Sequence, residues 1–195
     1  GGLPAFAGIA WHCYGGGPKS MRKLSRRWSS LDPPLEQHLT ECSGGAWAGE
    51  WSLIPDQLQL FVGGALNMGQ SVLRFNIALD ENHGPHCAGG SCCEDCRGMV
   101  TLPSWATVLD EVVFEVDFYG LAHHSAFLLP GARRIHSAVE GDGVHAVAYR
   151  NSNGSLVVVA VNAREDGYNA SLAIQDISDG SNFRFELPPG VATFA

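Results

Sequence analysis

Basic residues are scarce in this chain of 195 residues, which has 12 Lys and Arg against 20 Asp and Glu. The formal net charge of −8 leaves no positive field of the kind that a nucleic-acid-binding surface needs. The one basic run, residues 19–28, has the spacing of a solvated helix face. Apolar runs are short as well, and none reaches the roughly 18 residues that span a bilayer. We therefore expect no nucleic-acid partner and no transmembrane segment.

The N-terminus also lacks an initiator methionine and a signal peptide. The chain opens on GGLPAFAGIAWHCYGG, which is already a strand-like apolar run. The alternatives are a mature chain and an incomplete one, and a start in mid-domain favours the incomplete chain.

Residues 1–129 alternate apolar, strand-like runs with stretches of helical spacing. The expected strands are 5–14, 39–45 and 71–79, and the expected helices are 51–70 and 115–129. This alternation predicts a parallel α/β arrangement, although three strands cannot close a barrel.

From residue 130 onward the pattern changes to short alternating strands joined by tight turns. The clearest signal is GVHAVAYRN, the turn SNG, and SLVVVAVN, which together predict a β-hairpin. Further short strands follow at regular spacing. We expect residues 130–195 to form a small antiparallel β-sandwich.

Polar side chains stand at the ends of the three expected strands: His12 and Tyr14, then Glu41, then Asn76 and Asp80. The carboxyl ends of parallel strands form the active site of a (β/α)₈ barrel. Each residue also has an ordinary alternative, because a buried His or Tyr is usually a core residue with one satisfied hydrogen bond. Asp80, with Glu81 beside it, lies among turn formers. Glu41 is the strongest candidate, since it follows an apolar approach and precedes a Gly-Gly pair.

A cysteine- and histidine-rich stretch between residues 83 and 96 allows three interpretations: disulfides, a zinc site or free thiols. Its members are His83, His86, Cys87, Cys92, Cys93 and Cys96. The four cysteines are disulfide candidates of the kind found in secreted proteins, whereas Cys93-x-x-Cys96 with a nearby histidine would also suit zinc. We favour disulfides. Two N-glycosylation sequons, at Asn153 and Asn169, are compatible with secretion.

Several ordered motifs together resemble glycoside hydrolase family 30, the glucosylceramidase-like retaining β-glycosidases. They are FAGIAWHCYGG (6–16), TECSGG (40–45), FNIALDENHGPH (75–86), CRGMVTL (96–102) and FYGLAHHSAFLLPGARRI (118–135). The resemblance covers essentially the whole chain. It implies that residues 1–129 hold about strands six to eight of a (β/α)₈ TIM barrel, followed by the β-sandwich of residues 130–195.

The resemblance also implies a role for each candidate residue. Glu41 matches the family's catalytic nucleophile, and His12 and Tyr14 match the residues that support it. Phe75 and Asn76 stand where the family usually has Trp-Asn. For the tryptophans that follow Glu41, Trp47 and Trp51, stacking on sugar rings competes with packing in the helical wall. No metal or cofactor is implied.

The second catalytic carboxylate of a retaining glycosidase is expected outside this sequence. In the family it lies in an Asn-Glu motif on strand four, and the sequence has no Asn-Glu dipeptide. We therefore expect this chain to supply only the nucleophile half of the site, to need the N-terminal part of the same barrel as its partner, and to hydrolyse no β-glucoside alone.

The substrate stays open between two classes of β-glucoside. A glucosylceramidase-like enzyme acts on a glycolipid, whereas fungal relatives cut β-1,6-glucan, and we expect a secreted, lysosomal or other extracellular protein. Two other interpretations are a carbohydrate-binding or purely structural sandwich built by residues 131–195, and a zinc-dependent module.

Overall fold

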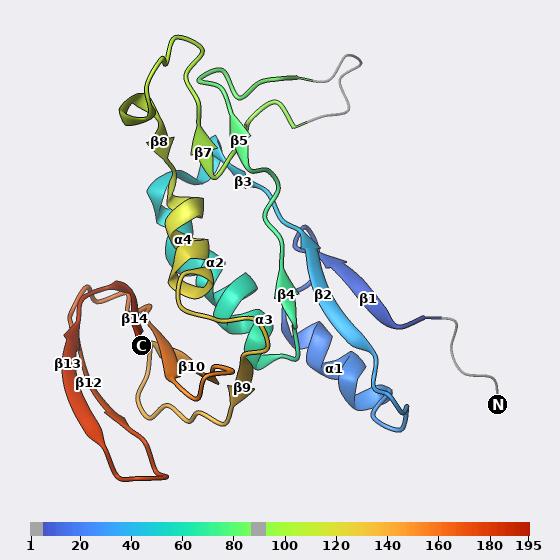
Figure 1. Ribbon diagram of the computed structural model, residues 1–195, viewed down its shortest axis with the longest axis vertical. Helices are drawn as coiled ribbons and strands as arrows, with labels where there is room; N and C mark the ends of the chain where they lie inside the picture. The colour runs from blue at the N-terminus through green and yellow to red at the C-terminus, as the bar shows by residue number, and fades with distance from the viewer. Residues whose placement is uncertain (1–5, 87–92) are drawn as a thin grey trace. The chain divides into compact units, whose positions relative to one another are not determined.

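The computed structural model describes residues 6–86 and 93–195 (Figure 1). The chain divides into two compact units, the first ending at Ala122 and the second comprising His123–Ala195. This division lies within helix α4 (Val116–Ser125), whereas the sequence analysis placed a boundary after residue 129.

The first unit contains a three-stranded parallel sheet with the order β1-β2-β4. Its strands are β1 (Gly8–His12), β2 (Glu36–Glu41) and β4 (Ser71–Val72). Helix α1 (Lys19–Arg27) connects β1 to β2 and buries Met21, while its basic side chains stay exposed. The basic run is therefore the solvated helix face that its spacing predicts.

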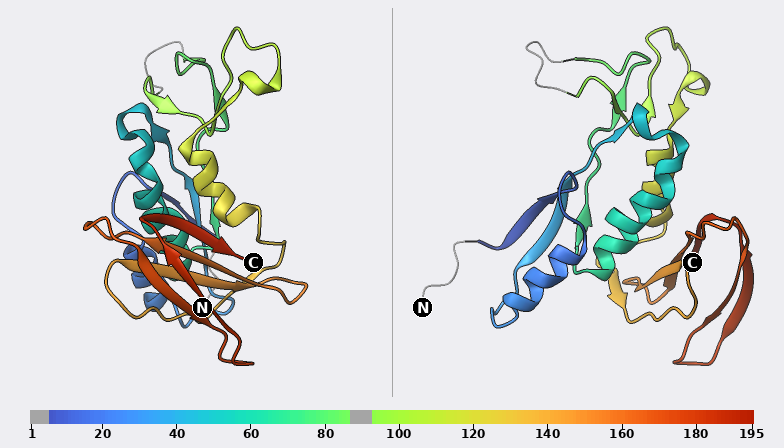
Figure 2. Two further views of the ribbon diagram at one scale, coloured as in Figure 1. Left: turned by 90° about the vertical axis from the view of Figure 1, so that its left-hand side faces the viewer. Right: turned by 180° about the vertical axis from the view of Figure 1, so that it is seen from behind.

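A second helical layer follows β2 in the chain. It consists of η1 (Ala46–Ser52), α2 (Leu53–Asp56), the π-helical η2 (Gln57–Phe61) and α3 (Val62–Leu66). Helix α4 lies beside it in all views (Figure 2), and the buried Gln57 amide donates a hydrogen bond of 2.8 Å to the Gly120 carbonyl of α4. Leu60 and Phe61 pack against Cys42 at the end of β2. Within the described ranges, no helix is long and apolar enough to cross a membrane.

The expected strand over residues 71–79 is wrong in its extent, because the structure divides it into β4 and β5 (Ala78–Leu79). The Phe75 amide still bonds to the Cys42 carbonyl, at 3.0 Å. From Asn76 the chain changes partner, and its carbonyl accepts from the Met99 amide at 3.0 Å. The apolar pattern continues through this exchange and does not reveal it.

Short strands complete the first unit beyond this point. Strand β5 pairs with β7 (Val100–Thr101), β7 pairs with β8 (Val113–Phe114), and β3 (Gly44–Gly45) pairs with β6 (Cys96–Arg97). A turn of 3₁₀ helix, η3 (Leu109–Glu111), precedes β8.

The second unit is antiparallel, as the sequence predicts. One sheet has the order β14-β11-β10-β9, and the other is the hairpin of β12 and β13. The strands are β9 (Arg133–Ile135), β10 (Val144–Arg150), β11 (Leu156–Asn162), β12 (Ala170–Gln175), β13 (Asn182–Leu187) and β14 (Gly190–Phe194). The predicted β10–β11 hairpin is confirmed. Phe183 and Phe185 of β13 contact Phe194 of β14, with ring centroids 5.0 and 5.2 Å apart, so the two sheets meet through aromatic side chains.

Candidate active site

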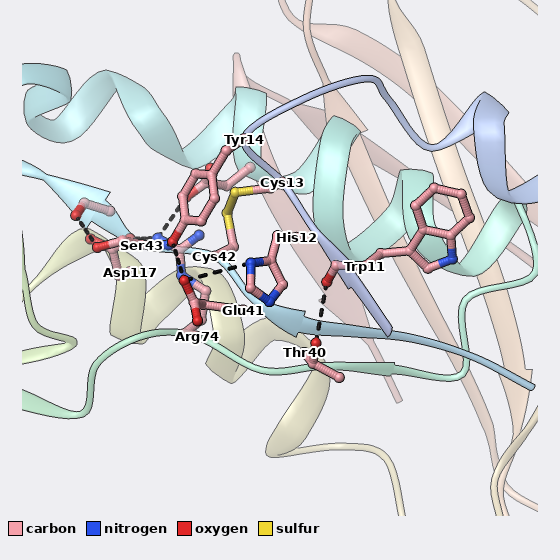
Figure 3. The surroundings of a disulfide bond; sticks show 12 residues. Trp11, His12, Cys13, Tyr14, Thr40, Glu41, Cys42, Ser43, Arg74 and Asp117 are labelled. Carbon is pink, nitrogen blue, oxygen red and sulfur yellow. Dashed lines mark hydrogen bonds and ion pairs between the residues drawn. A yellow bond between two sulfur atoms is a disulfide. The ribbon is translucent and has the colours of Figure 1, made fainter. Parts of the chain in front are cut away.

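Glu41 and His12 meet because β1 and β2 run parallel and end at the same edge of the sheet. The register pairs Trp11 with Leu39 and then, after a bulge, His12 with Glu41. The last backbone contact is the Cys13 amide, which donates to the Glu41 carbonyl at 3.3 Å. The segments that follow β1 and β2 then leave the sheet, and their side chains lie around the Glu41 carboxylate (Figure 3).

The Glu41 carboxylate receives its contacts on one oxygen. The Tyr14 hydroxyl donates to Oε1 at 3.1 Å, and His12 Nδ1 lies 3.7 Å from the same atom. The Ser43 amide donates to the Tyr14 hydroxyl at 3.2 Å, which leaves the phenol proton for Glu41. Among the described residues, none donates a hydrogen bond to Oε2. Oε1 is thus held by Tyr14 and approached by His12, whereas Oε2 is left without a donor among the described residues.

Tyr14 is kept in its protonated, donating form. Burial raises the pKa of its phenol, and the hydrogen bond to Glu41 and the charge of Glu41 raise it further. The Ser43 amide and the Arg74 guanidinium act in the opposite direction, and the pKa stays raised. The site is nevertheless open, since the Glu41 side chain is 37% exposed. A ligand could reach the carboxylate without displacing the chain.

A disulfide between Cys13 and Cys42 lies beside these contacts (Figure 3). The sequence analysis missed it, because only the cysteines near residue 90 were considered. A signal was present: one cysteine follows His12 and the other follows Glu41.

A buried cluster of four charges, also missed from the sequence, adjoins the Glu41 loop. Asp117 forms ion pairs with Arg74 and with Arg97, whose Nε lies 2.7 Å from Asp117 Oδ2. Arg74 also lies 3.2 Å from Asp56, and Arg97 donates to the Ser52 hydroxyl at 3.0 Å. Burial lowers the pKa of Arg74, although the charge of Asp56 opposes this. No sequence pattern brings these residues together.

Close packing explains why glycine occupies both positions 44 and 45. A β-carbon at Gly44 would overlap the Asp117 carboxylate, and one at Gly45 would overlap the Trp47 ring. Asp117 cannot move aside, because two guanidinium groups hold it. The backbone of β3 is therefore packed directly against side chains.

The other residues predicted for the site lie around this edge. The backbone of Phe75 bridges to Ser43, and the Phe75 side chain is 50% exposed. Trp47 and Trp51 are 65% and 89% exposed, so neither packs inside a helical wall of the described chain. The carbonyl oxygen Oδ1 of Asn76 is buried and has no hydrogen-bond partner among the described residues.

The acidic residues after β5 serve the loop rather than the site. Asp80 Oδ1 accepts from the amides of Asn82 and Gly84, both at 2.8 Å. Glu81 accepts from the Ser104 amide at 2.7 Å and from its hydroxyl, and these bonds lower the pKa of Glu81. This matches the turn-forming alternative.

Cys93 and Cys96 form a disulfide. Their thiolates are therefore not available as zinc ligands, which argues against the zinc alternative. Cys87 and Cys92, the other two disulfide candidates, lie outside the described residues. Within the described chain, no group of three or more His, Cys, Asp or Glu side chains is arranged to hold a metal ion.

A hollow of about 140 Å³ borders β1 and helix α1. It is lined by Trp11, His12, Cys13, Gly15, Gly16, Gly17, Pro18, Met21, Leu39, Gln59 and Leu60. Neither Glu41 nor Tyr14 lines it, so it lies beside the carboxylate rather than around it.

Comparisons with known proteins agree on one family. The profile of the glycosyl hydrolase family 30 beta sandwich domain matches residues 131–194. An endo-1,6-beta-D-glucanase of Neurospora crassa is 30% identical in a match of 173 positions that covers 79% of this chain and 32% of that protein. The endo-1,6-beta-D-glucanase neg1 of Aspergillus fumigatus is 27% identical over 164 residues, covering 79% of this chain and 30% of its own length.

Among solved structures, the endo-beta1,6-glucanase BT3312 superposes with a TM-score of 0.82 at 26% identity. The match covers 96% of this chain and 40% of that one. The chain spans about a third of the length of the curated relatives that it matches.

Proposed function

We propose that this chain, which belongs to glycoside hydrolase family 30, carries the nucleophile of a retaining β-glycosidase that cleaves β-1,6-glucan. The chain matches the C-terminal portion of proteins of that family. The observation that carries the proposal is the Glu41 carboxylate, held by Tyr14 and approached by His12 at one oxygen only.

In this proposal Glu41 Oε2 attacks the anomeric carbon, and the glycosidic C–O bond breaks as the new C–O bond forms. The Tyr14 hydrogen bond and the His12 contact orient the carboxylate, so that the attacking oxygen is already positioned before the reaction. Water then attacks the glycosyl-enzyme at the same carbon and releases Glu41 as a carboxylate.

A retaining mechanism requires a second carboxyl group roughly 5–5.5 Å from the first, which protonates the leaving oxygen and later activates the water. We assign this acid/base to the N-terminal part of the same (β/α)₈ barrel, to which β1, β2 and β4 would contribute about strands six to eight. The chain's coverage of only about a third of its relatives supports this assignment.

The names of the relatives favour β-1,6-glucan over the glycolipid of a glucosylceramidase. A net charge of −8 gives no attraction to anionic lipid, which points the same way. The exposed rings of Trp47, Trp51 and Phe75 offer apolar surface to sugar faces. Two disulfides fit a secreted enzyme.

The sandwich suits a structural role better than a carbohydrate-binding one. Phe183 and Phe185 are engaged with Phe194, and Tyr149 is only 8% exposed. Phe183 and Phe185 are 42% and 41% exposed, but their rings are inclined by 55° and 76° to that of Phe194, so they form no flat stacking platform with it. Tyr168, at 70% exposed, stands alone.

The test compares two glutamates of strand β2 in the full-length enzyme. Glu41→Gln should reduce turnover of β-1,6-glucan by about a thousandfold or more, because it removes the nucleophile. Glu36→Gln, at the opposite end of the same strand, should leave turnover unchanged. The 195-residue chain alone should show no hydrolysis. Activity that survives Glu41→Gln would refute the proposal, and faster turnover of glucosylceramide than of β-1,6-glucan would refute the substrate.

A further inference from the structure

The Cys13–Cys42 disulfide joins two segments whose neighbouring residues form the site. Cys13 stands between His12 and Tyr14, and Cys42 stands between Glu41 and Ser43. These four neighbours are the residues that make the contacts of the Glu41 carboxylate and its phenol partner. The covalent bond thus joins the two chain segments at the point where their functional side chains meet.

Beyond the register shift, few residues of the two segments pair. The shift lies between Trp11 and His12, and after it the strands pair at His12 with Glu41, followed by a backbone hydrogen bond of 3.3 Å from the Cys13 amide to the Glu41 carbonyl. Tyr14 is 60% exposed, so its hydrogen bonds are open to water. Water competes for such bonds, so they fix a geometry poorly without support.

The bond is buried at Cys42 and partly buried at Cys13. Cys42 is 3% exposed and packs with Leu60 and Phe61, and Cys13 packs against the same cluster. Burial of Cys42 shields one of the two sulfur atoms from a reductant, which favours a structural role over a redox switch. Its surroundings suit a permanent structural disulfide.

We propose that the Cys13–Cys42 disulfide is a positioning element that holds Tyr14 against Glu41. It acts through these residues and touches no substrate. The inference rests on the proposed function of Glu41, but its geometric part can be measured without turnover.

The kinetic test removes both cysteines, as Cys13→Ser/Cys42→Ser, in the full-length enzyme. We expect kcat for β-1,6-glucan to fall on the order of ten- to a hundredfold with KM within about twofold, because misplaced catalytic groups cost rate rather than binding. Cys93→Ser/Cys96→Ser is the control: it also removes a disulfide, whose Cys96 sulfur accepts a hydrogen bond from the Ser43 hydroxyl rather than joining the segments that carry Tyr14 and Glu41. It should leave kcat within about threefold.

A double-mutant cycle separates positioning from a general loss of stability. In a Tyr14→Phe background the phenol is already gone, so opening the disulfide should lower kcat much less than in the parent. An equal fold-loss in both backgrounds would overturn the proposal, as would an unchanged kcat in the parent. If the serine variant does not fold, Cys13→Ala/Cys42→Val restores apolar volume and takes its place.

The geometric test titrates Tyr14 by NMR in the full-length enzyme with ¹³Cζ-labelled tyrosine, using Tyr14→Phe to assign the signal. Opening the disulfide should lower the pKa of Tyr14 toward its ordinary value, because the phenol leaves Glu41. An unchanged titration would overturn the proposal even if the enzyme were inactive. Inactivity of the parent on β-glucans would instead count against the proposed function alone.

Discussion

Asp117→Asn should be the most damaging single charge change in the first unit. The Asp117 carboxylate is 1% exposed and lies between Arg74, at 2%, and Arg97, at 9%. Asparagine keeps the shape but removes the charge, which leaves two buried guanidinium groups with Asp56 as their remaining acidic neighbour. Removing one partner of a buried ion pair costs about 3–5 kcal/mol, because the other charge stays desolvated.

The assay is urea unfolding followed by tryptophan fluorescence. All five tryptophans, Trp11, Trp28, Trp47, Trp51 and Trp105, belong to the first unit, so this signal reports that unit alone. With an m-value of about 2 kcal/mol/M, the predicted loss lowers the unfolding midpoint by about 2 M urea.

The matched control is Glu36→Gln, which breaks the exposed pair of Glu36 with His38 in the same unit. Surface pairs contribute little, so its midpoint should stay within about 0.3 M of the parent. If Asp117→Asn moved the midpoint no further than this control does, the buried charges would not stabilise the unit as argued.

Two further predictions concern the glycine pair and a buried histidine. Gly44→Ala should destabilise the first unit strongly in the same assay, since a β-carbon would overlap the fixed Asp117 carboxylate. Gly45→Ala should lower the unfolding midpoint only mildly, because the exposed Trp47 ring can turn away. Equal effects of the two variants would contradict this reasoning. Burial lowers the pKa of His124 to about 4. The unfolded chain takes up this proton near pH 6.5, so between pH 6.5 and 4 the unfolded state binds more protons and stability falls with falling pH, by about 2 kcal/mol at pH 5. Urea unfolding of the second unit by circular dichroism should show that His124→Phe flattens this dependence and that His145→Gln, at an exposed position, does not; a slope unchanged by His124→Phe would refute the assignment.

The sequence predicts best where local chemistry decides the structure. The turn SNG and its alternating flanks are enough to predict the β10–β11 hairpin. Glu41, His12 and Tyr14 could be placed at strand ends, and parallel strands bring such ends together.

What the sequence does not predict depends on tertiary packing. Asp117, Arg74 and Arg97 meet only because α4, β6 and the β4–β5 connection converge, and isolated charged residues give no sign of a buried partner. The split of residues 71–79 follows from an exchange of hydrogen-bond partners along one apolar run. The Cys13–Cys42 pairing depends on the register of β1 against β2, which composition does not reveal.

The most direct test of the account is to trap the covalent intermediate. The full-length enzyme is treated with 2-deoxy-2-fluoro-β-gentiobiosyl fluoride, a β-1,6-linked substrate analogue whose glycosyl-enzyme hydrolyses slowly, and its peptides are sequenced by mass spectrometry. The account predicts one modified peptide with the sugar ester on Glu41. A label on any other carboxylate, or hydrolysis with inversion and no label, would contradict it.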